Sequence, residues 1–463
     1  MNKLIPLSSI ATLKTGPFGT QFSANEYVES GIPVINVRNI GYGEIITDDL
    51  EYVNEETRER LSEHILKTGD IVFGRKGSVD RHAYIDDRYD GWVQGSDCIR
   101  VRCSSEVNTR YLSHFLKLEF VKNQINNAAV GSTMASLNTD ILGRVRIALP
   151  CREIQDRIER VLSAIEEKIE NNSLISIQLE SMAKTLYDYW FVQFDFPDAN
   201  GQPYRASGGE MVWNEQMKRE IPKGWEAGCL SEVANIVMGQ SPDGTSYNED
   251  GMGMVFYQGR TDFGTRFPTP RVYTTAPTRF AKEGDILLSV RAPVGDLNIA
   301  MEDCCIGRGL AALNSKLGSQ LHLLYTLSGF KQIFDVMDGN GTTFGSITKD
   351  TLFEMKVAIP HSEFLKAFEE AVSPIEQKIR ACEIESRELS ELRDWLLPML
   401  MNGQATVAPA ESAPKLQVLQ PEKPARDPRF DRWLQTQGVA ARGTVDEQTL
   451  HDIFDAMDDD DKQ

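Results

Sequence analysis

GSTMASLNTDILGRVRIALP, residues 131–150, and GTTFGSITKDTLFEMKVAIP, residues 341–360, align with each other without a gap. The two stretches share glycine, threonine, serine, aspartate, leucine, alanine and a final proline, and apolar residues face apolar residues at most other positions. They lie 210 residues apart. This agreement indicates that the chain contains a repeat.

The repeat extends outward from these stretches. LSSIATLKTG at residues 7–16 resembles LSEVANIVMG at 230–239, GIPVINVR at 31–38 resembles GMVFYQGR at 253–260, and GDIVFGRKGSV at 69–79 resembles GDILLSVRAPV at 284–294. The order of the matches is kept, while their offset only falls, from 223 through 222 and 215 to 210. This pattern predicts a duplicated domain whose second copy has lost loop residues. Convergent strand and turn chemistry is the alternative.

Length and composition describe a folded chain of several domains. The chain has 463 residues, of which 41% are hydrophobic and 25% charged, and this length favours two to four domains. It lacks an apolar run near the roughly 18 residues that span a bilayer and an N-terminal secretion signal, so we expect no membrane contact and a cytoplasmic location. The seven cysteines form no CxxC pair, which favours buried free thiols.

Short apolar runs such as IPVINV, DIVF and VRIALP lie between glycine-rich turns in each copy, with one helical stretch beginning at Thr109. This mixture predicts an α+β domain built on a mainly antiparallel sheet. After Pro150 and Pro360, apolar residues recur at steps of three and four, and IEEKI and IEQKI match at the offset of 210. We therefore expect a long helix after each domain, with Pro374 kinking or locally breaking the second one.

The predicted fold consists of two repeated globular domains separated by two long antiparallel helices that bury each other's apolar stripes, in a pseudo-twofold arrangement. The predicted segments are a first recognition domain at 1–150, a central helix at 151–195, a linker at 196–224, a second recognition domain at 225–360, a C-terminal helix at 361–403 and a tail at 404–463. In the tail we expect a Pro-rich disordered linker and then a short helix capped by Thr444 and Glu447.

Charge is distributed unevenly. The net charge is −19, but residues 1–150 hold 17 basic and 19 acidic side chains, and residues 201–360 hold 15 and 18. The acidic excess therefore lies mostly in the predicted helices and tail. The acidic charge of the whole chain argues against a nucleic-acid-binding protein. The two domains taken separately are nearly neutral, however, so each could still carry a basic face.

The sequence matches known catalytic motifs only weakly. GDIVFGRK from Gly69 approaches a phosphate-binding loop, but Arg75 replaces the lysine and the preceding residues Ile71, Val72 and Phe73 are typical of a strand. Glu166 and Glu376 each precede a lysine by two residues, as in nuclease carboxylate and lysine pairs. Because both lie on predicted helices, we interpret them as solvated charges. The sequence has no HExxH or GxSxG motif and no adenine-methyltransferase signature of the DPPY or NPPY kind.

Taken in order, these motifs resemble the specificity subunit of type I restriction-modification systems. The resemblance covers about residues 1–403 and includes EIQDRIERVLSAIEEKI, SMAKTLYDYWFVQFDF and EIPKGWE. It implies a non-catalytic subunit that reads a split double-stranded DNA target with two recognition domains. It also implies partners: two adenine methyltransferase subunits docked along the helices, and restriction subunits that act as motor and nuclease. S-adenosylmethionine, ATP and magnesium would bind those partners, and no cofactor would bind this chain.

The duplication divides the candidate DNA-binding residues into those shared by both copies and those that differ between them. Residues shared by both copies cannot explain different half-sites, so we expect them to hold phosphates or to shape the fold: Arg38 with Arg260, Lys76 with Arg291, and Thr133 with Thr343. Polar residues that differ between copies are candidate base readers. These are Arg75, Arg81, His82 and Gln94 in the first copy and Arg308 in the second. Arg266 and Arg271 are further candidates, in a stretch of the second copy that does not align with the first.

Candidate partner-binding residues come from the helical stripes: Ile158, Ile165, Ile169, Phe368, Ile375 and Ile379. Two other classes of protein fit parts of the sequence. An architectural coiled-coil interaction protein without DNA binding would suit the acidity, and a single-chain enzyme would need an active site that none of these motifs reveals.

Overall fold

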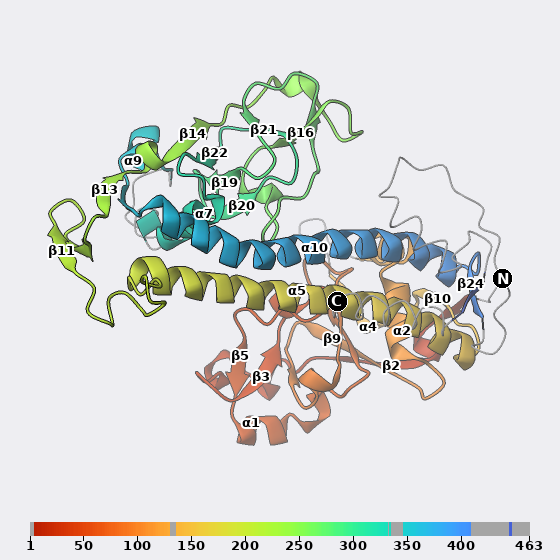
Figure 1. Cartoon of the computed structure of the whole chain (residues 1–463). Helices are drawn as coiled ribbons and strands as arrows, with labels where there is room; N and C mark the ends of the chain where they lie inside the picture. Colours follow the sequence, from red (N-terminus) through yellow and green to blue (C-terminus); the bar gives the residue numbers. More distant parts are fainter. Residues whose placement is uncertain (1–3, 130–135, 332, 335–345, 409–443, 447–463) are drawn as a thin grey trace. The chain divides into compact units, whose positions relative to one another are not determined.

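The computed structural model describes residues 4–129, 136–331, 333–334, 346–408 and 444–446 (Figure 1). The chain divides into two compact units, of which the first combines Met1–Ile169 with Arg387–Gln463 and the second is Glu170–Ser386. The long helices α5, Arg152–Tyr187, and α10, Ser362–Met401, each contribute one half to each unit. Each unit therefore holds one copy of the repeat and one half of each helix.

The main sheet of the first unit has the strand order β2-β9-β6-β7-β4. Its strands pair antiparallel except for β4 with β7, which is parallel. The central strand β6 is fully buried, which fits its apolar run Ile-Val-Phe-Gly. The bounds are β2 Ala11–Thr15, β4 Tyr42–Gly43, β6 Ile71–Gly74, β7 His82–Tyr84 and β9 Cys98–Cys103.

The second unit repeats this topology in a four-stranded sheet of order β14-β22-β19-β20. All of its strand pairs are antiparallel, and its central strand β19 is again fully buried. The predicted duplication and the mainly antiparallel sheet are thus confirmed. The bounds are β14 Ala234–Met238, β19 Ile286–Ser289, β20 Leu297–Ile299 and β22 Leu310–Ser315.

Smaller sheets complete each copy in the same way. A short parallel pair occurs in both, β3 with β8 and β16 with β21, and the closing strand of each repeat pairs with an opening strand, β10 with β1 and β23 with β13. The bounds in the first unit are β1 Leu4–Pro6, β3 Ile32–Ile35, β5 Glu51–Val53, β8 Val93–Gln94 and β10 Arg146–Ala148. Those in the second are β13 Glu226–Cys229, β15 Tyr247–Asn248, β16 Met254–Tyr257, β17 Tyr273–Thr274, β18 Phe280–Ala281, β21 Cys304–Ile306 and β23 Lys356–Ile359.

Short helices cover these sheets. Helix α2 and its counterpart α7 begin alike, because the side chains of Asn108 and Ser319 accept a hydrogen bond from the backbone three residues later. The bounds are α1 Glu55–Arg60, α2 Thr109–Leu116, α3 Glu119–Ala128 and α4 Thr139–Gly143 in the first unit, and α6 Leu230–Val233, α7 Gln320–Gly329 and α9 Lys349–Phe353 in the second.

The two long helices pack against each other within each unit. In the first unit Ile158, Leu162 and Ile165 of α5 share a core with Leu389, Leu392 and Leu396 of α10. In the second unit Ala183 and Tyr187 of α5 share a core with Phe368, Val372 and Ile379 of α10. Each of the isoleucine, leucine, valine and phenylalanine side chains among them contributes about 1.5–3 kcal/mol through burial. The apolar stripes predicted from the sequence therefore bury each other.

Contacts along the helices run in opposite directions. Arg157 donates to the carbonyl oxygen of Val407 at 3.0 Å, Asn172 donates to Glu385 at 2.7 Å, and the rings of Tyr187 and Phe368 lie 6.0 Å apart. The pair is therefore antiparallel, as predicted. The predicted local break at Pro374 is wrong, since α10 runs uninterrupted through it. Burial of Phe368, Val372 and Ile379 on both sides of the proline outweighs the loss of one backbone hydrogen bond.

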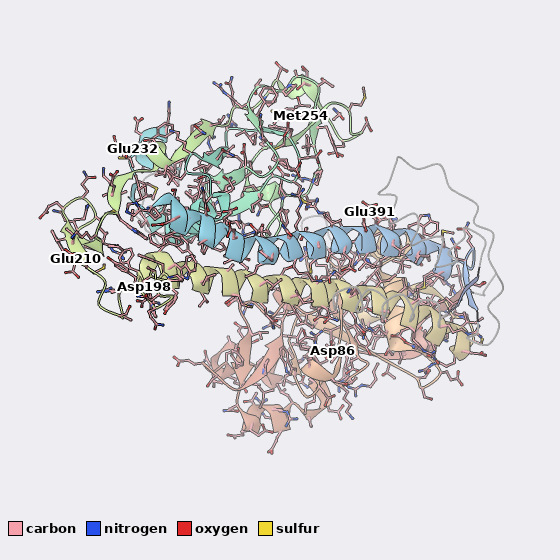
Figure 2. All side chains as sticks on the ribbon, in the orientation of Figure 1. Asp86, Asp198, Glu210, Glu232, Met254 and Glu391 are labelled. Carbon is pink, nitrogen blue, oxygen red and sulfur yellow. The ribbon has the colours of Figure 1, made fainter. Side chains whose placement is uncertain are left out.

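The segment predicted as a linker, 196–224, is folded within the second unit. It holds the hairpin of β11, Met211–Asn214, and β12, Arg219–Pro222, beside Asp198 and Glu210 (Figure 2). At its start, Phe196 is 1% exposed and packs on Tyr204, Trp225 and Phe364. Aromatic burial therefore ties this segment to the second recognition domain.

In the tail, β24, Thr406–Ala408, pairs parallel with β25, Thr444–Asp446. Thr444, expected to cap a helix, thus lies in a strand with the two residues that follow it, and the predicted helix from residue 447 on lies outside the described residues. Within the described part of the chain, no helix combines the length and apolar character needed to cross a membrane.

Candidate nucleic-acid interface

The same loop contact occurs in both repeats. Lys76, just after β6, forms an isolated backbone bridge with Ser136, and Arg291, just after β19, forms one with Ser346. Next to these bridges, the backbone N–H of Leu137 donates to Arg75 at 2.8 Å, and that of Ile347 donates to Val290 at 2.9 Å. Segments about 60 residues apart in the sequence therefore meet beside a basic residue in each domain.

These two shared basic residues differ in their surroundings. Lys76 is about half exposed and pairs with Asp97 at 3.1 Å. Arg291 is exposed and forms no ion pair with any residue that the structure describes. Both positions suit contact with a phosphate, but only Lys76 is partly neutralised. Thr133 and Thr343, the shared hydroxyl pair predicted here, lie outside the described residues.

The other shared basic pair follows equivalent strands. Arg38 comes after β3 and pairs with Asp49 at 3.4 Å and Glu51 at 3.2 Å. Arg260 comes after β16 and pairs with Asp296. Their side chains are 44% and 55% exposed, so both can be reached from solvent. In both cases the carboxylates reduce the charge that remains available for a phosphate.

Three of the predicted base readers are buried and therefore cannot reach DNA bases. His82 is 1% exposed and its Nε2 lies 3.0 Å from the Ser113 hydroxyl, while Gln94 is 0% exposed and donates to the carbonyl oxygens of Lys14 and Cys98. Arg266 is 6% exposed. Each of these three side chains has hydrogen-bond partners inside the protein, although Nδ1 of His82 and Oε1 of Gln94 have none among the described residues. Their burial corrects the prediction for all three.

Arg266 is the centre of a buried ion-pair cluster in the second unit. It donates to Glu376 of α10 at 2.6 Å and to Glu180 of α5 at 3.1 Å, and its guanidinium lies 5.6 Å from the ring of Tyr325. Burial alone lowers the pKa of Arg266, but the Glu376 carboxylate more than offsets this and holds the pKa above its usual value. Arg266 thus fixes its recognition domain to both long helices.

A related cluster occurs in the first unit. Glu166 of α5, the repeat counterpart of Glu376, accepts from Lys117 at 2.5 Å and lies 3.6 Å from Nδ1 of the buried His114. Burial lowers the pKa of His114 to about 3, so this histidine is neutral at pH 7. Glu166 and Glu376, predicted to be solvated, are instead 22% and 17% exposed and join domain to helix.

The remaining candidates stay accessible. Arg308 is exposed, and Arg271 is 60% exposed and pairs with the buried Asp262 at 2.9 Å. Arg75 and Arg81 are half-buried, and the Nε of each lacks a hydrogen-bond partner among the described residues. Arg81 lies over the ring of Tyr42, with Lys122 beside it. The sequence analysis missed Tyr42 and Lys122. A comparison of α3 with the segment that holds Lys331 could have brought Lys122 forward, whereas no sequence pattern singles out Tyr42.

The predicted partner-binding residues do not form an outer surface. Ile158, Ile165, Phe368 and Ile379 are at most 4% exposed, and Ile169 and Ile375 are partly buried against the same cores. Contacts within the chain use these side chains, because each long helix turns its stripe toward the other helix and its own domain. The four buried side chains are therefore not available to a partner.

The structure also places the motifs and cysteines that the sequence raised as possible chemical sites. Ile71, Val72 and Phe73 form buried strand, so the segment from Gly69 is not a phosphate-binding loop. Within the described ranges, no three His, Cys, Asp or Glu side chains gather as metal ligands would. All seven cysteines are free; four are buried as predicted, whereas Cys103 and Cys229 are partly exposed and Cys151 is exposed.

Comparison with known proteins identifies the family. Residues 3–181 and 222–391 match the type I restriction modification DNA specificity domain, in two copies that together cover most of the chain. The chain is 29% identical over 390 residues to MjaX, a provisionally named type I restriction enzyme specificity subunit of Methanocaldococcus jannaschii, covering 81% of this chain and 88% of that protein. It is 21% identical over 437 residues to the type I restriction enzyme HindI specificity subunit of Haemophilus influenzae, covering 80% and 94%.

The fold is also known from crystallography. The structure of a type I restriction-modification system S subunit from M. genitalium is similar over 86% of this chain and 96% of that one, with a TM-score of 0.53 and 15% identity. The family follows from the repeated domains, the matched basic loops and the two copies of the family domain. The chain belongs to the type I restriction-modification specificity family, and it is a non-catalytic subunit that supplies DNA recognition to such a complex.

Proposed function

We propose that each recognition domain reads one half of a split DNA target, with the loops after β6 and β19 against the DNA. The observation that carries this proposal is the repeated bridge of Lys76 to Ser136 and of Arg291 to Ser346. It provides a basic residue at the same place in both domains, while neighbouring positions differ, as Arg75 and Val290 do. Shared positions would hold phosphates, and differing positions would distinguish bases.

The proposed partners are two adenine methyltransferase subunits, one for each half-site, and restriction subunits that add cleavage. S-adenosylmethionine, ATP and magnesium would bind those partners, and the complex would act in the cytoplasm. The methyltransferases would meet the outer faces of the long helices, where Leu174, Ile177 and Met182 of α5 are 52%, 52% and 60% exposed. Exposed apolar side chains on a helix surface favour a protein partner.

The test is to express the chain with and without a methyltransferase partner and to map methylated adenines across a genome. With the partner we expect methylation at one split sequence with a constant spacer, and without it none. Exchange of residues 225–360 for the same region of a relative should change one half-site only. Methyl transfer by the isolated chain, or loss of both half-sites in the exchange, would contradict the proposal.

A further inference from the structure

Two cations share one exposed aromatic ring in the first recognition domain. The guanidinium of Arg81 lies 5.4 Å from the ring centroid of Tyr42, and the ammonium of Lys122 lies 4.9 Å from it. The parallel pairing of β4 with β7 places Tyr42 opposite His82, next to Arg81, and α3 supplies Lys122. Residues from three segments, far apart in sequence, therefore contact one another at one place.

The charges of this cluster are not neutralised within the described structure. Neither Arg81 nor Lys122 forms an ion pair with a described residue, and the Nε of Arg81 is buried without a hydrogen-bond partner there. The neighbouring Lys117, by contrast, is paired with Glu166 at 2.5 Å. Two cations that contact the same aromatic ring, without a described carboxylate to neutralise either, form a site that favours an anion.

The second repeat shows what these positions look like when they are neutralised. Asp296 is the repeat counterpart of Arg81, at the offset of 215. Lys331 corresponds to Lys122, because each precedes by three residues a side chain that is 0% exposed, Phe334 or Ile125. Lys331 donates to Asp296 at 2.9 Å, and Arg260 also pairs with Asp296. The same two positions thus hold an internal ion pair in one domain and two cations in the other.

We propose that Arg81, Lys122 and Tyr42 form a phosphate clamp, which binds a backbone phosphate of DNA in the first recognition domain only. This inference rests on the proposed function. The guanidinium offers paired N–H donors and the ammonium a compact charge, and both groups match phosphate oxygens. The residue at this position differs between the repeats because only the first domain holds a DNA phosphate here. Arg81 then positions the DNA backbone, whereas the sequence suggests that it reads a base.

The test compares salt dependence of DNA binding in the full chain complexed with its methyltransferase. The probes are a 40-base-pair duplex of random sequence and one carrying the methylated sequence found in vivo. The variants Arg81→Gln and Lys122→Gln should each lower the slope of log affinity against log salt by roughly one, for both duplexes, and the double variant by roughly two. The methylated sequence should stay the same.

Matched controls come from cations over other rings. Arg88 lies 5.3 Å from the ring of Tyr89, but it is paired at 2.8 Å with Asp86, which Figure 2 labels in the same domain. Lys349 lies 5.0 Å from the ring of Phe353 in the other domain. Arg88→Gln and Lys349→Gln should leave the slope unchanged. Thermal melting of each variant separates a lost contact from a lost fold.

The outcomes distinguish the clamp from the function on which it rests. If the parent complex binds neither duplex, the proposed function fails. If the parent binds and the folded clamp variants keep its salt slope, only the clamp is overturned. A changed methylated sequence in Arg81→Gln would also overturn it, because that result would make Arg81 a base reader.

Discussion

Arg266 donates to Glu376 at 2.6 Å while its own side chain is only 7% exposed. The pair joins the loop after β16 to the long helix α10 within the second unit. Arg266 forms a second ion pair, at 3.1 Å, with Glu180 of α5. A buried guanidinium with two carboxylates is therefore structural, although the sequence alone suggests a DNA contact.

Removing this guanidinium should destabilise the second unit. Arg266→Met leaves Glu376 buried without its cation, and loss of one partner of a buried pair costs about 3–5 kcal/mol. Urea denaturation of the parent and the variant measures this difference. As a control, Lys218→Met removes a lysine that is 75% exposed and paired with Glu215, and should cost less than about 1 kcal/mol. Equal stability of parent and Arg266→Met would contradict the role of the cluster.

The two shared basic residues should differ in their effect on DNA binding. Lys76→Ala and Arg291→Ala should each weaken binding to all sequences alike and lower the salt slope, because both would remove a phosphate contact. The change should approach one counterion for Arg291 and be smaller for Lys76, since Asp97 already pairs with Lys76 at 3.1 Å. Fluorescence anisotropy across a salt series measures both slopes. A change in the preferred bases would refute the phosphate assignment.

Buried histidine should make the first unit sensitive to mild acid. Burial, followed by the charge of Lys117, lowers the pKa of His82 to about 3, whereas the unfolded chain titrates near 6.5. Below pH about 6.5 the unfolded state therefore binds a proton that the folded state does not bind until pH about 3. The stability contributed by neutral His82 is full above that window and falls by about 1.4 kcal/mol per pH unit within it.

The variant His82→Gln should remove this part of the acid sensitivity. Between pH 6.5 and pH 5, its stability should fall by about 2 kcal/mol less than that of the parent. Hydrogen exchange of the β6 amides at several pH values reports on the first unit alone. His361→Gln changes an exposed histidine and should behave as the parent does. Identical pH profiles for the parent and His82→Gln would refute a buried neutral imidazole.

The long helices should act as a ruler between half-sites only when both are lengthened. The sequence favours a four-residue insertion after Asn171, where the apolar stripe is interrupted, but the structure corrects this choice. Asn172 is 2% exposed and donates to Glu385 at 2.7 Å and to Ser386 at 3.3 Å. An insertion in α5 alone would shift this contact out of register and should destabilise the pair.

Matched insertions after Asn171 and Ser386 should keep most of the pairing and lengthen both helices by about 6 Å. Since DNA rises about 3.4 Å per base pair, the spacer between the half-sites should grow by one or two base pairs. Genome-wide methylation mapping measures the spacer directly, and the α5-only insertion serves as the comparison. An unchanged spacer in a fully active double insertion would mean that partner subunits set the distance.

The sequence by itself determined the architecture of this protein. The falling offset between repeated motifs is a property of chain order, so it reveals two domains without any spatial knowledge. The helical stripes, such as Ile158, Leu162 and Ile165, follow from local periodicity and are confirmed by their shared core. Basic residues shared by both copies, Lys76 and Arg291, could be matched in the same way, and the structure places both at the same backbone bridge.

Only the tertiary structure decided which polar side chains are available. Arg266 and Glu376 lie 110 residues apart in sequence and 2.6 Å apart in space, and no local pattern records such a contact. Arg81 and His82 are neighbours in the chain, yet one lies beside an exposed ring and the other is buried. Arg81 lies just before β7 and His82 is the first residue of that strand, and packing against segments distant in sequence determines which of the two is covered. Burial of a polar residue is therefore a property of the folded neighbourhood and cannot be read from the residue's own segment.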